Sequence, residues 1–145
     1  MIVNNISKIL NKNFYVIIIG SGPAGISTAL QLEKKKINSL IIKAGSLEYN
    51  SETQNYLKGE VIGDNSNDLE VTRVRKFGGT SSIWGGNCNP MLDYDFKNWP
   101  IKKNNLNPYL GEAAKILDIN NSFKNEAINE QLKLIEFQVS EARFG

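Results

Sequence analysis

The sequence of 145 residues lacks histidine altogether and has a single cysteine, Cys88. Histidine is the side chain best suited to proton transfer near neutral pH, so the chain has no candidate for a histidine base. A single cysteine excludes a disulfide within the chain and favours a reducing compartment. We expect Cys88 to be a small buried apolar residue.

An excess of one charge and a long apolar segment are also missing. Lysine and arginine together number 17 against 15 acidic residues, so the charge balance does not favour nucleic acid or an anionic membrane as a partner. The longest apolar run, at residues 14–19, is well below the length of a membrane span, and the polar residues before it do not fit a signal peptide. We therefore expect a cytoplasmic protein of one domain's length, with no nucleic-acid or membrane partner.

The chain is organised around a strand, a glycine-rich turn and a helix. Residues 14–19 are rich in β-branched side chains and predict a strand that is buried on both faces, as in a parallel sheet. The spacing G-x-G-x-x-G follows directly at residues 20–25, and apolar residues at helical spacing come after it. A second apolar strand at residues 37–42, after a lysine run that suits the end of a helix, completes a predicted βαβ unit.

The glycines of this turn have distinct expected roles in binding a dinucleotide. Gly20 allows a sharp turn, Gly22 leaves room for a diphosphate beside the backbone, and Gly25 lets the helix pack closely on the strand. Pro23 suits the first helical turn, where its missing N–H needs no partner. The free N–H groups of that turn and the positive end of the helix dipole favour an anion. A glycine-rich turn that only bends the chain is the alternative.

A second glycine-rich stretch lies at residues 75–87. Two glycine pairs bracket hydroxyl residues and Trp84, so bare N–H groups, hydroxyl groups and one flat ring share a single loop. Such a loop could lie against a planar heterocycle or an anion. A glycine-rich turn in which Trp84 packs into the core explains the same residues. The sequence does not decide between this turn and a loop that faces a ligand.

The segments around these stretches give weaker signals. Residues 1–13 predict a frayed cap on the sheet, and residues 44–68 predict a polar loop or a poorly ordered arm. The composition of residues 69–74 favours a strand.

The last third of the chain predicts a mixture of elements. Asn107 and Pro108 predict the capped start of a helix. Residues 122–129 have a polar pattern compatible with a helix, and residues 133–140 predict a strand, although a helix also fits. No spacing typical of a metal site occurs in the sequence.

With both glycine-rich stretches in view, the chain resembles the glucose-methanol-choline (GMC) family of FAD-dependent oxidoreductases, in particular its bacterial members. The matching segments follow in order along the chain: residues 20–25, 40–45, 75–86, 95–96, 99–101, 106–109 and the last residues from 137 onward. The run from Gly78 to Gly86 is much more specific than the dinucleotide fingerprint. The resemblance spans almost the whole chain from residue 14 onward.

The resemblance implies an α/β fold in two parts. A Rossmann-like FAD-binding βαβ unit with an incomplete sheet is expected over residues 1–90, and the beginning of a truncated α+β substrate domain over residues 91–145. In the family, the CH–OH group of an alcohol or sugar is oxidised by hydride transfer to the flavin, and a histidine takes the hydroxyl proton. We expect the C-terminal part with those catalytic residues to be missing here, so no catalytic residue is assigned and the chain alone is expected to be inactive. A C-terminal partner polypeptide could supply that part.

The resemblance also implies a noncovalent FAD site, because Ile83 stands where some family members attach the flavin through a histidine. The residues that it assigns to the cofactor belong to both glycine-rich stretches and to the end of the second strand: Gly20, Gly22, Pro23, Ala24, Gly25, Lys43, Ala44, Arg75, Gly78, Gly79, Thr80, Trp84, Gly85 and Asn87. Lys43 replaces the acidic residue that usually accepts hydrogen bonds from the adenosine ribose. This lysine is the one feature that favours an NADP-binding module, and a catalytically inactive nucleotide-binding fragment is the other alternative.

Overall fold

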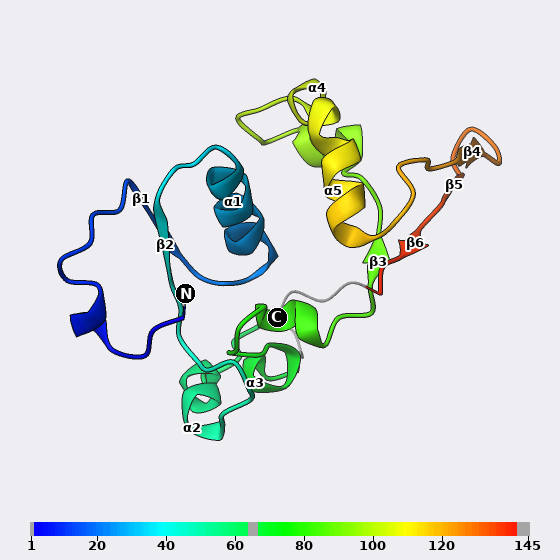
Figure 1. The fold of residues 1–145 in the computed structure, drawn as a ribbon. Coiled ribbons are helices and arrows are strands. Elements are labelled where there is room, and N and C mark those ends of the chain that lie inside the picture. Colours follow the sequence, from blue (N-terminus) through cyan, green and yellow to red (C-terminus); the bar gives the residue numbers. More distant parts are fainter. Residues whose placement is uncertain (1, 64–66, 142–145) are drawn as a thin grey trace. The chain divides into compact units, whose positions relative to one another are not determined.

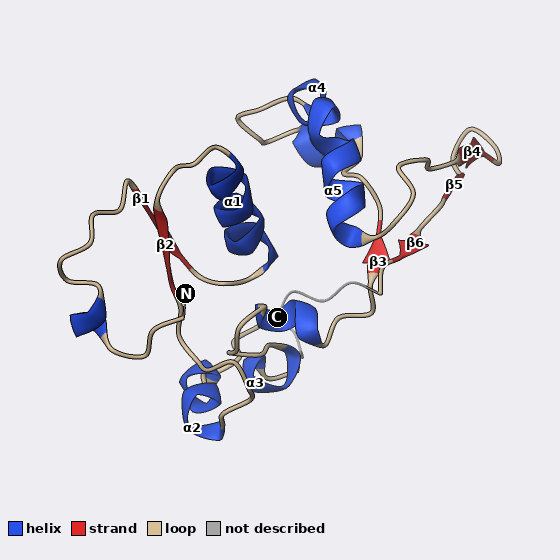
Figure 2. Cartoon of the chain, viewed as in Figure 1, coloured by secondary structure: helices blue, strands red, loops and turns tan. Residues whose placement is uncertain are grey.

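The computed structural model describes residues 2–63 and 67–141 of the chain (Figure 1). It is a small mixed α/β protein with short sheets, as Figure 2 shows. The chain divides into two compact units, of which the first ends at Ile83 and the second begins at Trp84. Residues 84–90, which the resemblance assigns to the cofactor-binding portion, therefore lie in the second unit.

The first unit contains a parallel two-stranded sheet with a helical connection. Strands β1 (Val16–Ile19) and β2 (Ser39–Ile42) pair along their full length, with Val16 opposite Ser39. Helix α1 (Pro23–Lys34) connects the strands and contacts both of them (Figure 1). The predicted order of strand, turn, helix and parallel strand is confirmed at the level of secondary structure.

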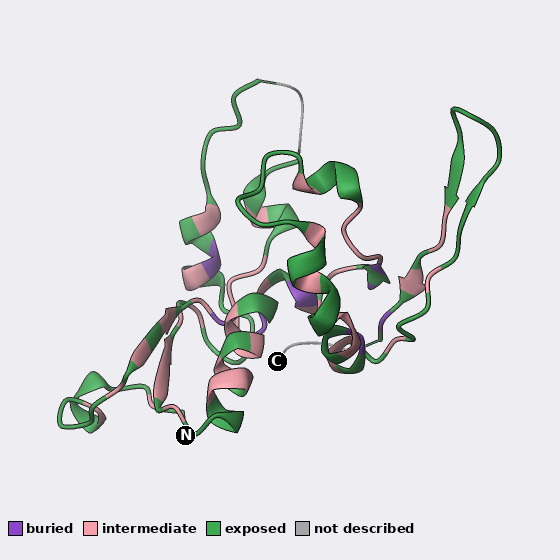
Figure 3. Cartoon of the chain, turned by 90° about the horizontal axis from the view of Figure 1, so that it is seen from above, coloured by how far each residue is buried: buried purple, intermediate pink, exposed green. Residues whose placement is uncertain are grey.

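Strand β1 is apolar on both faces, but one face alone is covered. Ile18 is half-buried beneath α1, where its Cγ2 atom would lie 3.3 Å from a Cβ atom placed on Gly25. Tyr15, Ile17 and Ile19 are 87%, 58% and 88% exposed. Figure 3 shows that most of the described chain is exposed or half-buried. The prediction of a strand buried on both faces is therefore wrong, because α1 covers one face and the two strands have no third neighbour in the described chain.

Short helices flank the sheet in the first unit. They are the 3-10 helix η1 (Ile6–Lys8) before the sheet and, after it, α2 (Ser51–Gln54), the 3-10 helix η2 (Asn55–Leu57), α3 (Leu69–Thr72) and the 3-10 helix η3 (Gly79–Ser82). The loop expected at residues 44–68 thus contains α2 and η2, and residues 64–66 of that prediction lie outside the described chain. Helix α2 begins after Asn50, because the Oδ1 atom of Asn50 accepts a hydrogen bond from the N–H of Thr53 at 3.0 Å.

Helix α3 replaces the strand expected at residues 69–74. Leu69 and Val71 are exposed, so the apolar residues of this segment have no sheet to pack on. The N–H groups of Thr72 and Arg73 donate to the carbonyl oxygens of Asp68 and Leu69 at 3.2 and 3.0 Å, which closes the helical turn. The strand prediction is wrong because local hydrogen bonds, and not pairing with a sheet, determine the conformation here.

The second unit contains a series of short helices. They are the 3-10 helix η4 (Asp93–Phe96), α4 (Lys103–Leu106), the 3-10 helix η5 (Asn107–Tyr109) and α5 (Leu110–Leu117). The prediction that Asn107 caps a new helix is wrong, because the chain is already helical from Lys103 and Asn107 has φ and ψ angles of −48° and −42°. Pro108 does lie in the first turn of a helical segment, η5.

Two short antiparallel pairs of strands complete the second unit. Strand β3 (Asn87–Cys88) pairs with β6 (Gln138–Val139), and β4 (Asn125–Ala127) pairs with β5 (Lys133–Ile135). The helical pattern expected at residues 122–129 is wrong, because this segment contains β4. Its turn is closed by Asn129, whose Oδ1 accepts from the N–H groups of Gln131 and Leu132. The strand expected at residues 133–140 is confirmed in part and splits into β5 and β6.

Few side chains are buried in either unit. Cys88 and Ala114 are the buried apolar side chains of the described residues, which confirms the expected burial of Cys88. Burial of apolar surface therefore contributes little to the stability of each unit. In the part of the chain that the structure describes, the helices are too short or too polar to cross a membrane.

Candidate functional site

The glycine turn (residues 20–25) connects β1 to α1, and its three glycines have different surroundings. Gly20 has a φ of 106°, which favours glycine, and its N–H donates to the carbonyl oxygen of Ile42 on β2 at 2.8 Å. A Cβ atom on Gly25 would overlap the carbonyl oxygen of Gly20, so any larger residue would push α1 away from the turn. A Cβ atom on Gly22 would meet no atom within 4 Å, which leaves open space beside this part of the backbone.

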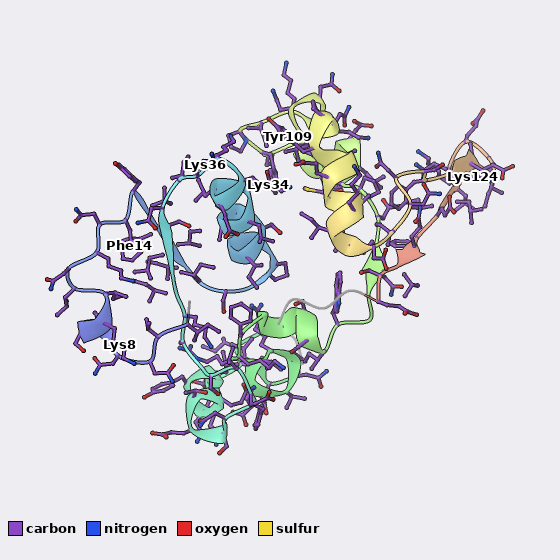
Figure 4. The ribbon with its side chains drawn as sticks, viewed as in Figure 1. Lys8, Phe14, Lys34, Lys36, Tyr109 and Lys124 are labelled. Carbon is purple, nitrogen blue, oxygen red and sulfur yellow. The ribbon has the colours of Figure 1, made fainter. Side chains whose placement is uncertain are left out.

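Helix α1 begins at this open space. Gly22 is its N-cap and supplies no side-chain hydrogen bond, and Pro23 occupies the first turn. The N–H groups of Ala24 and Gly25 have no acceptor within the helix, as in the first turn of any α-helix. Lys34 lies at the opposite end, where a positive charge interacts favourably with the helix dipole (Figure 4). The N-terminal end of α1 can therefore bind an anion through backbone donors.

A second segment of the first unit contacts the glycine turn. In the Gly78 loop (residues 76–79), the N–H of Gly78 donates to the carbonyl oxygen of Ser21 at 2.9 Å, and both residues are buried. A Cβ atom on Gly79 would lie 3.5 Å from the Cα atom of Gly22. The structure thus brings the first part of the second glycine-rich stretch against the dinucleotide fingerprint.

The end of β2 carries Lys43 and Ala44. Lys43 is half-buried, and its Nζ lies 3.5 Å from the carbonyl oxygen of Gly45 and 5.5 Å from the centre of the Phe77 ring. Burial lowers the pKa of Lys43 below the usual value for lysine. The ammonium group therefore lies at the base of the Gly78 loop, whereas Ala44 is exposed to solvent.

Arg75 precedes the Gly78 loop and contacts α2 and η2. Its backbone N–H donates to Oε1 of Gln54 at 3.0 Å, and its Cζ lies 5.4 Å from the centre of the Tyr56 ring. The Nε atom of Arg75 is buried and has no hydrogen-bond partner, so a donor is left unsatisfied in this segment. Thr80 bonds the segment before the loop, since its hydroxyl oxygen accepts a hydrogen bond from the N–H of Val74 at 3.3 Å.

Sequence reasoning did not identify Gln54. This residue lies in a segment expected to be a loop, and a lone glutamine there belongs to no motif or periodic pattern. In the structure it is buried and bonds three backbone groups of the segment that precedes the Gly78 loop. The sequence carries no signal that could have found it.

Trp84, Gly85 and Asn87 belong to the second unit. Trp84 is half-buried, and its indole Nε1 is buried without a hydrogen-bond partner. Asn87 pairs with Val139 in the ladder between β3 and β6, and Gly85 is exposed. The expected contacts of these three residues with a flavin stay predictions, and so do both interpretations of Trp84.

A hollow in the second unit contains none of the predicted site residues. It has a volume of about 470 Å³ and is lined in part by Phe96, Trp99 and Lys103. The rings of Phe96 and Trp99 meet edge to face at 5.9 Å, and Nζ of Lys103 lies 3.3 Å from Oδ2 of Asp93. Among the described residues, no group of three or more histidine, cysteine, aspartate or glutamate side chains could hold a metal ion.

The chain was also compared with known proteins. No protein-family model, curated protein or solved structure matches it.

Proposed function

We propose that the first unit binds the diphosphate of FAD, and that the chain is the cofactor-binding part of a GMC-type oxidoreductase. The observation that carries the proposal is the hydrogen bond from Gly78 to Ser21. It joins the more specific of the two glycine-rich stretches to the dinucleotide fingerprint, whereas a turn that only bends the chain needs no such partner. The reaction proposed for the complete protein is oxidation of the CH–OH group of an alcohol or sugar.

The residues around the glycine turn fit a diphosphate. The open space at Gly22 admits a phosphate oxygen next to the backbone, and the N–H groups of Ala24 and Gly25 can donate to it. Gly79 adds no side chain on the loop side, and Arg75 adds a positive charge in the preceding segment, where its guanidinium lies over the Tyr56 ring. These residues would hold the cofactor noncovalently, and FAD when bound supplies the hydride acceptor.

The end of β2 would meet the adenosine part of the cofactor. In dinucleotide-binding folds, an acidic residue at this place accepts hydrogen bonds from the ribose. Lys43 has three donors and no acceptor, and its ammonium group lies near Gly45 and the Phe77 ring. We therefore expect FAD to bind more weakly here than to a chain with a carboxylate at this position.

Two other functions use the same turn. A nucleotide-binding fragment without activity would need the glycine turn alone. An NADP-binding module would need the ammonium group of Lys43 for a 2′-phosphate, and Lys43 is the one residue that favours it. Neither alternative explains why the Gly78 loop contacts the turn, so FAD is the better supported cofactor.

The substitution Gly22→Ser separates cofactor binding from folding. Gly22 has extended angles (φ −78°, ψ −178°) and open space for a side chain, so serine fits here without strain. A serine N-cap would accept hydrogen bonds from the first N–H groups of α1 and fill the space proposed for the diphosphate. We expect α1 to be at least as stable as in the parent chain and FAD to bind about tenfold more weakly, or worse.

The measurement is a flavin fluorescence titration with FAD, with ADP and NADPH as competitors. Gly59→Ser is the matched control, because a Cβ atom on Gly59 also meets no atom within 4 Å and this residue lies outside the glycine turn. Far-UV circular dichroism reports the helix content of each variant. A parent chain that binds no FAD, or a Gly22→Ser variant that binds it as tightly as the parent, contradicts the proposal.

A further inference from the structure

Gln54 is a buried polar side chain that the proposed cofactor site does not use. It lies at the end of α2 and is 7% exposed. Its Nε2 donates to the carbonyl oxygens of Glu70 at 2.8 Å and Arg73 at 2.7 Å, and its Oε1 accepts from the N–H of Arg75 at 3.0 Å. One side-chain amide therefore satisfies three backbone groups.

Two of these groups, the carbonyl of Arg73 and the N–H of Arg75, lie after α3, and the third, the carbonyl of Glu70, lies within the short helix α3. After α3 the chain becomes extended at Arg73, with φ and ψ angles of −132° and 153°. An extended segment outside a sheet needs other partners for its N–H and C=O groups, because leaving them unpaired in a buried place is unfavourable. The side-chain amide of Gln54 supplies the hydrogen bonds that the backbone of a neighbouring strand would supply in a sheet.

The segment held by Gln54 leads directly to the glycine turn. Two residues beyond Arg75, the N–H of Phe77 donates to the carbonyl oxygen of Ser46 at 2.9 Å. The next N–H, that of Gly78, donates to Ser21 at 2.9 Å. Because these contacts are between backbone groups at consecutive positions, a shift at Arg75 would move Gly78 relative to the turn.

We propose that Gln54 is a positioning residue that sets where the Gly78 loop lies against the glycine turn and thereby sets the affinity for the nucleotide. The part that concerns affinity rests on the proposed function. The part that concerns the loop does not, since the hydrogen bond from Gly78 to Ser21 joins two backbone groups of the chain itself.

The substitution Gln54→Glu keeps the shape of the side chain and removes its donor. At pH 8 the introduced carboxylate would face the carbonyl oxygens of Glu70 and Arg73, and none of these groups has a proton to donate. Burial raises the pKa of the introduced carboxyl group, so at pH 5 it is protonated and can donate to one of the two carbonyl oxygens. The hydrogen bond that is lost at pH 8 should therefore form again at pH 5.

Other ionisable groups lie on the segments packed around this position. They are Glu52, Tyr56, Glu70, Arg73 and Arg75. The parent chain contains the same groups, so each variant is compared with the parent at the same pH.

Two measurements test the positioning role separately from the cofactor. The first is hydrogen exchange at the N–H of Gly78 in the chain without ligand, and the second is FAD affinity by fluorescence titration, both at pH 8 and pH 5. Gln138→Glu is the matched control in the second unit, because Gln138 donates to the carbonyl oxygen of Ser122 and accepts from the N–H of Asn120.

We expect Gln54→Glu at pH 8 to accelerate exchange at Gly78 about tenfold and to weaken FAD binding about tenfold, with both effects largely reversed at pH 5. Gln138→Glu should change neither quantity. Unchanged exchange at Gly78 in Gln54→Glu at pH 8 overturns the positioning role, and faster exchange with unchanged FAD affinity overturns its link to the nucleotide.

The exchange measurement still tests the positioning role if the parent chain binds no FAD or if Gln54→Glu does not fold. If the parent chain binds no FAD but Gln54→Glu still accelerates exchange at Gly78, the proposed function fails and the positioning role stands. If Gln54→Glu does not fold at pH 8, Gln54→Met removes the three hydrogen bonds without adding a charge, and exchange at Gly78 decides in the same way.

Discussion

The three glycines of the glycine turn have different physical roles. Gly20 needs its positive φ, Gly22 faces open space, and Gly25 leaves no room for a Cβ atom. A side chain therefore has a different effect at each position, namely backbone strain, filling of a free space or steric overlap. The spacing of the motif reflects these separate requirements.

At the residue scale we expect Lys43→Glu to tighten FAD binding. A carboxylate can accept hydrogen bonds from both ribose hydroxyl groups, which lysine cannot do. One hydrogen bond to a charged group contributes about 1.5–3 kcal/mol, which corresponds to a gain in affinity of about ten- to a hundredfold. The lost contact of Nζ with Gly45 is long, at 3.5 Å. A flavin fluorescence titration with NADPH as competitor measures the change.

The control for this prediction is Lys43→Met, which removes the ammonium group without adding an acceptor. The affinity of Lys43→Met for FAD should be lower than that of Lys43→Glu. Unchanged or weaker binding after Lys43→Glu would mean that this side chain does not face the ribose. Tight NADPH binding by the parent chain would overturn the flavin assignment itself.

Among the elements, α1 is attached to the sheet by close backbone packing and not by a buried core. None of its residues is fully buried, and its N-terminal end lies against Gly20 and Ile18 through Gly25. Because this contact leaves no space, the position of α1 relative to β1 depends on one residue that lacks a side chain.

Gly25→Ala should therefore destabilise the chain although alanine has the higher helix propensity. Overlap with the Gly20 carbonyl oxygen should lower the free energy of unfolding by about 1–3 kcal/mol. Gly111→Ala in α5 is the matched control, because its Cβ atom would lie 3.7 Å from Nδ2 of Asn121, and we expect it to raise the free energy of unfolding by about 0.5–1 kcal/mol. Urea unfolding followed by far-UV circular dichroism tests whether the two shifts have opposite signs, and a common sign would contradict this account.

The molecule as a whole exposes apolar surface and unpaired strand edges. In the described chain each sheet has two strands, and one face of β1 is exposed at Tyr15, Ile17 and Ile19. Such edges and faces are the usual sites of association between chains.

We therefore expect the purified chain to self-associate. Sedimentation velocity should give an apparent mass that rises with protein concentration, and Ile19→Lys should lower it because the charge lies on the exposed face of β1. Leu134→Lys in β5 is the control, since this residue is also exposed but lies in the second unit. A monomer at all concentrations would show that the exposed face does not drive association.

Elements with local signals could be predicted from the sequence, and elements that depend on a partner could not. The spacing of glycines and the apolar runs specify β1, α1 and β2 because each signal lies within the element or next to it. The structure differs from the prediction at residues 69–74, where α3 forms, and at residues 122–129, which contain β4. The outcome depends on whether another segment offers hydrogen bonds.

The sequence by itself determined the parallel strand pair, the helix between its strands and the glycines that the turn between β1 and α1 requires, since these follow from backbone sterics and local periodicity. The tertiary structure alone decided that one face of β1 stays uncovered, that Gly78 bonds Ser21 and that Gln54 satisfies three backbone groups. Each of these depends on groups far apart in the sequence. Their hydrogen-bonding and packing partners exist only once the chain has folded.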